Sequence, residues 1–316
     1  MHKLQALYQG SKRTLLPKRW QVETRLDVNQ HCPPLPELGG FSRHQLFNFV
    51  TSACVEDAPR QEMYNYASHD FERFVRTVGL VEGLSGCCLE LGANPYFTTL
   101  LLSEFTELDL TLANFFSETH PDQATQKVRY LSAKDCINQE KSFDFHHFNV
   151  ESSDFPFQTG QFDVVIFAEI IEHLLNDPCA VIREIKRVLK PGGHLILTTP
   201  NVARLENVAK MIMGVNIYDP YSGYGPYGRH NREYNQHELS LLMEHEGFTS
   251  EVMYTADVHP SGVENFLSLS QLPDFSAARA ASLGQYLFTR FRATGDEPST
   301  RPSWLYRSYP PNELSE

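Results

Sequence analysis

The order of apolar and polar residues predicts alternating strands and helices between residues 63 and 201. Five short apolar runs have the length of buried strands, at residues 87–91, 108–113, 143–148, 162–167 and 194–198. Apolar residues spaced three or four apart predict helices over 63–80 and 181–189. Alternation of this kind is typical of an α/β protein whose parallel strands are joined by helices.

The stretch from Cys87 to Leu102, CCLELGANPYFTTLLL, predicts a strand, a tight turn and the start of a helix. Gly92 allows the sharp turn, and Asn94 and Pro95 suit the N-cap and the first helical position. A helix that begins here would point its free amides at the turn. Because ligands of open α/β sheets bind beyond the carboxyl ends of strands, we expect a carboxylate-bearing ligand at this turn.

Two later segments follow in a recognisable order. FDVVIFAEIIEHL, from Phe162 to Leu174, combines a buried strand with two glutamates and a histidine, and LKPGGHLILTTPN, from Leu189 to Asn201, combines a turn with another strand. Together with the first stretch, they resemble motif I, motif IV and the following turn and strand of the class I S-adenosylmethionine-dependent methyltransferases. The first stretch has fewer glycines than the family usually has. A non-catalytic binding protein of the same fold is therefore the alternative.

The resemblance implies a Rossmann-like, doubly wound, mostly parallel seven-stranded sheet with helices on both faces and an N-terminal extension. It also implies a helix over 235–246, capped by Asn235 and ended at Gly247. An antiparallel pair of strands at 248–254 and 285–292 would complete the sheet.

The expected domain organisation has two parts. Residues 1–80 would form a basic arm, a linker and a helical cover, and residues 81–316 the methyltransferase domain. Within that domain we expect a substrate-lid insertion at about 214–234 and a tail at about 294–316.

The same resemblance places S-adenosylmethionine (SAM) at the carboxyl edge of the sheet. The implied contacts come from Glu90, Gly92, Ala93, Asn114, Asn149, Glu151 and the backbone near Ala168. Asn114 stands 22 residues after Gly92, where the family usually has an acid that binds the ribose hydroxyls, and an amide can also bond a diol. At the adenine edge we expect Glu151 first and Asn149 second.

Glu169, Glu172 and His173 are spaced i, i+3 and i+4, and a helix starting directly after the fourth strand would stack them on one face. His230 is expected to fold back over the same edge. Glu-x-x-Glu-His with a distant histidine is similar to metal-dependent small-RNA 2′-O-methyltransferases and, in part, to the O-methyltransferases of ubiquinone synthesis. This implies a site for Mg²⁺, Mn²⁺ or Zn²⁺ made by the four residues. Without a metal, His173 would act as the catalytic base, with Glu169 and His230 as further catalytic candidates.

Composition and charge limit the binding partners and the cellular location that we expect for this protein. The chain of 316 residues is 41% hydrophobic, which suffices for one large core with appendages. Its net charge of −12 repels polyanions and argues against a nucleic-acid partner. Because no apolar run could span a bilayer and the basic N-terminus lacks the apolar core of a signal peptide, we expect a cytoplasmic protein. The six cysteines show no C-x-x-C spacing and are expected to be reduced.

The segment from Ile217 to Tyr234, IYDPYSGYGPYGRHNREY, repeats tyrosine every three residues among glycines and prolines, which predicts an ordered loop. Aromatic faces suit a sugar ring or another planar acceptor. We therefore expect O-methylation of a hydroxyl on a sugar, a glycan or a related small polar acceptor. RNA and a quinone-like phenol are the alternative acceptors, and the sequence predicts no oligomeric state.

Overall fold

The computed structural model describes residues 32–152, 154–266, 280–295, 298 and 300–315. The basic arm expected at the N-terminus falls on residues 1–31 and lies outside this part of the chain. Within the described ranges, no helix has the length and apolar character that a membrane crossing requires. All six cysteines are free there, and Cys88 and Cys179 are the buried ones.

Both faces of the central sheet are covered, because apolar side chains alternate between two hydrophobic cores. In β6 (Phe162–Ala168), Val164 and Ile166 pack into one core, whereas Val165 and Phe167 pack into the other. All four side chains are almost completely buried. A strand buried in this way needs a layer of helices on each side.

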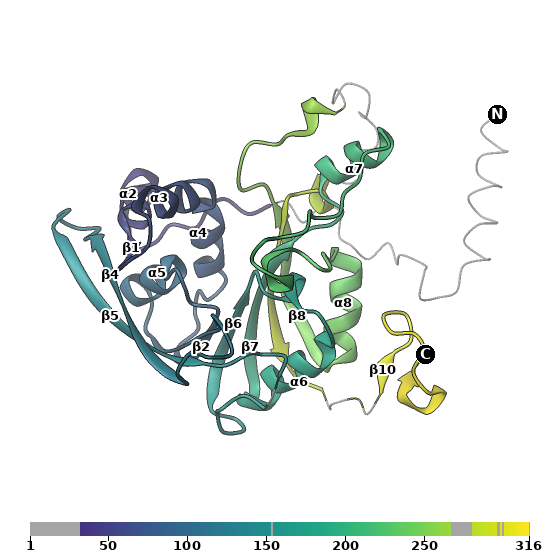
Figure 1. The fold of residues 1–316 in the computed structure, drawn as a ribbon. Coiled ribbons are helices and arrows are strands. Elements are labelled where there is room, and N and C mark those ends of the chain that lie inside the picture. The colour runs from purple at the N-terminus through teal and green to yellow at the C-terminus, as the bar shows by residue number, and fades with distance from the viewer. Residues whose placement is uncertain (1–31, 153, 267–279, 296–297, 299, 316) are drawn as a thin grey trace.

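The nine strands of this sheet are mixed in direction and follow the order β1-β4-β5-β3-β2-β6-β7-β9-β8 (Figure 1). Their bounds are Cys54–Val55 (β1), Gly86–Leu91 (β2), Leu108–Asn114 (β3), Gln123–Leu131 (β4), Asn138–His147 (β5), Phe162–Ala168 (β6), Leu189–Pro200 (β7), Phe248–Ala256 (β8) and Tyr286–Ala293 (β9). The five central strands, from β5 to β7 in this order, run parallel. The pairs β1–β4, β4–β5, β7–β9 and β8–β9 are antiparallel. The expected seven-stranded, mostly parallel sheet is thus corrected in two respects: two further strands, β1 and β4, lie beyond β5, and the sheet is mixed, with four parallel and four antiparallel pairs.

Helices form a layer on each face of the sheet (Figure 1). The α-helices are Arg43–Ser52 (α2), Arg60–His69 (α3), Phe71–Gly79 (α4), Phe97–Phe105 (α5), Pro178–Val188 (α6), Leu205–Ile212 (α7) and Gln236–His245 (α8). The helices α2 to α5 pack into the first core, and α6 and α8 pack into the second. Short 3-10 turns lie at Ile171–His173 (η2), Pro226–Gly228 (η3), Val263–Asn265 (η4), Ala280–Ser282 (η6) and Pro311–Glu313 (η7).

The C-terminal segment forms a separate two-stranded parallel pair, β10 (Arg301–Pro302) and β11 (Leu314–Ser315). Arg301 pairs with Asp177, the residue that caps α6, at 3.0 Å. The C-terminal segment is therefore fastened to the start of that helix.

Some of the expected helices are confirmed and others are divided. Asn235 caps α8 by accepting a hydrogen bond from the Glu238 amide, and Gly247 follows its end with a φ of 76°. The helix expected over 63–80 is two helices, α3 and α4, which meet at Asp70. The antiparallel final pair, β8 and β9, is confirmed.

Candidate active site

A cavity of about 190 Å³ lies at the carboxyl ends of the parallel strands β2, β3, β5 and β6. Its lining consists of Leu91, Gly92, Ala113, Asn114, Phe115, Phe148, Asn149, Val150, Glu169, Ile170, His173, Leu174 and Tyr227. Open α/β sheets bind their ligands at this edge. A mostly apolar wall with a few amide, carboxylate and imidazole groups is typical of a small-molecule site.

The turn after β2 brings the backbone close to the cavity. Gly92 has a φ of 70°, and a Cβ at this position would lie 2.8 Å from the Ile170 side chain. Its amide donates a hydrogen bond to the Ala113 carbonyl at 2.8 Å. The turn is thereby tied to the end of β3, and glycine is the residue that fits it.

Asn114, the candidate ribose contact, lines the cavity and also braces this turn. Its side-chain oxygen accepts a hydrogen bond from the Asn94 amide at 2.7 Å, and its side-chain nitrogen donates to the Tyr96 hydroxyl at 3.0 Å. The helix α5 begins at Phe97, with Tyr96 at the N-cap in a left-handed conformation. The expected cap at Asn94 and Pro95 is therefore wrong.

Three other predicted cofactor residues, Glu90, Ala93 and Ala168, lie outside the lining of the cavity. The Glu90 side chain accepts a hydrogen bond from the Thr99 hydroxyl at 2.7 Å and is 3% exposed. Burial raises the pKa of Glu90 to about 8. Its carboxyl group is consequently mostly protonated at neutral pH.

The two candidates for the adenine edge have different positions. Glu151 also lies outside the lining, because its carboxylate accepts hydrogen bonds from the Leu175 amide at 3.0 Å and the Asn176 amide at 2.7 Å. Asn149 lines the cavity. The second choice is therefore better placed than the first.

Two aromatic residues of the lining, Phe115 and Tyr227, were not expected. Phe115 directly follows Asn114, and its ring meets that of Tyr227 edge-on at a centroid distance of 6.0 Å. The Tyr227 hydroxyl accepts a hydrogen bond from the Asn149 side chain at 3.0 Å. The repeating tyrosines marked this loop in the sequence, but they did not distinguish the one tyrosine of the four that reaches the cavity.

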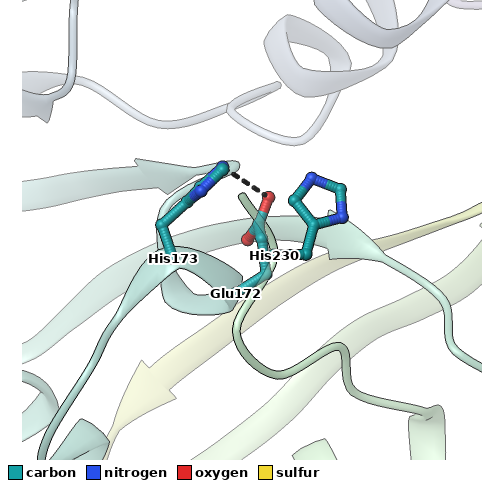
Figure 2. A group of neighbouring side chains, drawn as sticks. All are labelled: Glu172, His173 and His230. Carbon is teal, nitrogen blue, oxygen red and sulfur yellow. Dashed lines mark ion pairs between the residues drawn. The ribbon is translucent and has the colours of Figure 1, made fainter. Parts of the chain in front are cut away.

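Next to the cavity, Glu172, His173 and His230 bring their ligating atoms within 4.8 Å of one another (Figure 2). We call these three residues the Glu-His-His cluster. The Nδ1 atom of His173 donates to the Arg229 carbonyl at 2.9 Å, because a carbonyl can only accept. The Nδ1 atom of His230 bonds the Glu233 carboxylate at 2.8 Å. Nε2 of each ring is then the atom available to a metal.

The three side chains of the Glu-His-His cluster have shifted pKa values, and one carboxyl oxygen lacks a hydrogen bond within the described part of the chain. Burial, reinforced by the charge of Glu169, raises the pKa of Glu172 to about 8. One of its oxygens accepts from the Thr199 hydroxyl at 2.9 Å, whereas Oε1 has no hydrogen-bond partner among the described residues. Burial lowers the pKa of His173. For His230, burial also acts to lower the pKa, but the nearby carboxylates outweigh it and raise the pKa above its usual value.

Glu169, the fourth predicted ligand, lines the cavity but does not belong to the cluster. Its carboxylate accepts a hydrogen bond from the Thr198 hydroxyl at 2.8 Å. The expected helix through Glu169 and His173 is wrong, because Glu169 has a φ of 55° and is followed by the single 3-10 turn η2. The next α-helix, α6, begins at Pro178.

Asn231 fixes the loop that carries His230 onto η2. Its amide donates to the Glu172 carbonyl at 2.7 Å, and its side chain donates to the His173 carbonyl at 3.0 Å. The fold-back of His230 over this edge of the sheet is therefore built from backbone contacts as well as from side chains.

A family model described as a methyltransferase domain matches residues 65–251. Ubiquinone biosynthesis O-methyltransferase from Xanthomonas oryzae pv. oryzae is 54% identical over 44 residues, which make up 14% of this chain and 18% of that relative. The enzyme of the same name from Idiomarina loihiensis is 33% identical over 76 residues, 24% of this chain and 29% of that one. The matches thus span less than a third of these curated relatives.

Solved structures with similar folds include a SAM-dependent methyltransferase from Thermotoga maritima, at 17% identity and a TM-score of 0.45. The alignment covers 74% of this chain and 96% of that chain. A second, from Archaeoglobus fulgidus, has 13% identity and a TM-score of 0.42, covering 70% of this chain and 91% of that one.

Proposed function

Because this chain belongs to the methyltransferase domain family, for which SAM is the implied cofactor, we propose that it is an O-methyltransferase. Its acceptor would be a hydroxyl of a sugar, a glycan or a related small polar molecule. The observation that carries the proposal is the double position of His173, which lines the cavity and also belongs to the Glu-His-His cluster. A donor in the cavity and an acceptor oxygen at the cluster would meet at this residue.

The reaction requires close positioning of two molecules. The acceptor oxygen attacks the sulfonium methyl in line, so that an O–C bond forms, the S–C bond breaks and the hydroxyl proton leaves. Holding the reactants in this geometry can supply a large part of the rate. Gly92, Asn114 and Asn149 would hold the donor, since they line the cavity.

The cluster fits a divalent cation held by Glu172, His173 and His230. Oε1 of Glu172 is buried without a hydrogen-bond partner among the described residues, and a cation would satisfy it. A carboxylate and two imidazoles suit Mn²⁺ or Zn²⁺, and also Mg²⁺ with added water ligands. When bound, such an ion would lower the pKa of an acceptor hydroxyl. If no metal binds, the neutral imidazole of His173 is the group available to take the proton.

The acceptor class rests on the loop that precedes His230. Tyr218, Tyr221 and Tyr224 are between 82% and 93% exposed, and the Arg229 guanidinium lies 4.6 Å from the Tyr221 ring centre. Exposed aromatic faces suit the apolar face of a sugar ring. The second candidate is a quinone-like phenol, which the partial similarity to ubiquinone O-methyltransferases favours. RNA is disfavoured because the net charge of the chain is −12.

The test is a screen of nucleotide-sugars, glycans and quinone-like phenols with detection of S-adenosylhomocysteine (SAH). We expect turnover with a carbohydrate acceptor. Turnover confined to phenols would show that the second candidate, a quinone-like phenol, is the acceptor class instead. Calorimetry with SAH is a separate arm. Folded protein that gives no heat of binding would support the non-catalytic alternative instead.

The role of the cluster is tested by metal removal and by Glu172→Gln. We expect excess EDTA to abolish turnover and one of the three ions to restore it. Because a neutral glutamine side chain could not supply a charged ligand, we expect this variant to lose at least about 100-fold in activity. Glu140→Gln, at an exposed position of β5, is the matched control and should retain full activity. Full turnover in EDTA would remove the metal from the proposal.

A further inference from the structure

The loop from Pro226 to Tyr234, which we call the bridging loop, contacts the donor cavity and the Glu-His-His cluster at the same time. At the cavity, Tyr227 lies against Phe115 and accepts the hydrogen bond from Asn149. It is the exception among the regularly spaced tyrosines, since Tyr218, Tyr221 and Tyr224 are largely exposed.

At the cluster, the same loop supplies a ligating side chain and a backbone support. His230 is one of the three residues that converge (Figure 2), and the Arg229 carbonyl orients the ring of His173. Asn231 ties the loop to the carbonyls of η2. Any displacement of this loop would therefore disturb both histidines.

His230 is three positions after Tyr227, so their Cα atoms are at most about 10 Å apart even in an extended chain. Only Gly228 and Arg229 lie between the tyrosine at the cavity and the histidine at the cluster. In addition, His173 is common to the cavity wall and to the cluster. The two sites thus share a loop and a side chain.

We propose that Tyr227 couples the two sites, so that SAM or SAH and a divalent cation each bind more tightly when the other is present. The inference rests on the proposed function, because it requires both ligands. A nucleoside in the cavity would contact the aromatic pair of Phe115 and Tyr227 and hold the bridging loop in place. The loop would then hold His230 in position for the metal, so that metal binding would cost less conformational entropy. Thermodynamic linkage requires that each ligand raise the affinity for the other by the same factor.

The experiment is calorimetric titration of SAH into metal-free protein and into protein saturated with Mn²⁺. For the wild-type chain we expect SAH affinity to rise about tenfold with Mn²⁺. For Tyr227→Ala we expect that gain to fall below about twofold, because the loop loses its contact with the nucleoside. Tyr227→Phe keeps the ring and loses the bond to Asn149, and should retain most of the gain. Tyr64→Ala, at an exposed tyrosine of α3, is the control and should behave as wild type.

The outcomes separate this inference from the function on which it rests. If both ligands bind but SAH affinity is the same with and without Mn²⁺, or if Tyr227→Ala keeps the full gain, the coupling is wrong and the proposed function stands. If Mn²⁺ gives no heat of binding, the coupling falls together with the metal part of the proposal. If SAH itself does not bind, the methyltransferase proposal falls as well. Circular dichroism of each variant shows that it is folded.

Discussion

At the scale of single residues, the most informative group is the carboxylate of Glu172. A fully buried carboxyl group costs free energy when one of its oxygens accepts no hydrogen bond among the described residues, and a chain selected for stability alone would have an apolar residue here. Its neighbours make the cost more pronounced, since burial and Glu169 raise its pKa together. The proposed cation would satisfy this oxygen.

Glu233 provides a residue-scale prediction, because it orients His230 without belonging to the cluster. Burial acts to raise the pKa of Glu233, but the bonds to His230 and Arg204 outweigh it and lower the pKa, so that a carboxylate faces the imidazole. Groups that hold a metal-binding histidine typically affect metal affinity 10- to 100-fold. We expect Glu233→Gln to weaken Mn²⁺ binding about tenfold in calorimetric titration.

The matched control is Glu238→Gln. Glu238 lies on α8 and forms an ion pair with Arg232 of the bridging loop, which the substitution removes. It should leave Mn²⁺ affinity within about twofold of wild type. Equal losses in the two variants would show a general effect of charge on the loop rather than orientation of His230. Comparable SAH affinity in metal-free protein would confirm that both variants keep the donor cavity.

At the scale of elements, the turn after β2 is the clearest case of a local sequence that determines a site. Gly92→Ala would place a Cβ 2.8 Å from Ile170 at a φ of 70°. Both the contact and the left-handed backbone oppose the substitution, which should destabilise the fold by about 1–2 kcal/mol. Because Gly92 lines the cavity, we also expect SAH affinity to fall at least tenfold.

Gly83→Ala separates the two effects. Gly83 also has a positive φ, 77°, but a Cβ there would meet nothing within 4 Å in the part of the chain that the structure describes. It should lose stability in urea unfolding without losing SAH affinity. If Gly92→Ala bound SAH as tightly as wild type, the turn would not form part of the donor site.

The limits of sequence-based prediction follow from the same elements. The strand β6 was predictable because a run of apolar residues is a local signal for a buried strand. The bounds of α8 were predictable because Asn235 before the helix and Gly247 after it are local signals as well. The strand β4, QATQKVRYL, was missed because it is largely polar and lies near the edge of the sheet, with only Val128 fully buried. The turn η2 was predicted as part of an α-helix because the i, i+3, i+4 spacing matches one face of such a helix, whereas the left-handed backbone at Glu169 prevents a helix from starting there.

The candidate site shows the same division between local and tertiary information. Glu172, His173 and His230 were predicted as neighbours and are neighbours. Glu169 has the right spacing, yet its left-handed backbone carries its carboxylate to Thr198 instead. Tyr227 could not be singled out, because its contact with Asn149 joins loops that lie far apart in the sequence.

At the scale of the whole molecule, buried carboxyl groups should make stability depend on pH, and Glu90 allows the sign to be worked out. The pKa of Glu90 is about 8 in the folded protein, against an ordinary value of 4.5. Between these values the folded state retains a proton that the unfolded chain has lost. The free energy of unfolding therefore falls as pH rises, by up to about 1.4 kcal/mol per pH unit for this one group. The stabilising contribution is complete below pH 4.5 and is lost as pH rises towards 8.

We expect Glu90→Gln to remove the contribution of this group to the pH dependence while keeping the hydrogen bond from Thr99. Urea unfolding at pH 5.5 and pH 7.5 should show a loss in free energy that is smaller by about 2 kcal/mol in the variant than in wild type. The rest of the loss belongs to Glu172, whose pKa is also raised to about 8, and is common to both proteins. Asp163→Asn is the control of opposite sign, because Lys190 and the Cys87 amide lower the pKa of Asp163 below its usual value. The stabilising contribution of Asp163 is present throughout this range and is lost only in acid. The free energy of unfolding of Asp163→Asn should therefore be lower than that of wild type by a similar amount at both pH values. The same loss between pH 5.5 and pH 7.5 in wild type and in Glu90→Gln would mean that Glu90 is ionised in the folded protein.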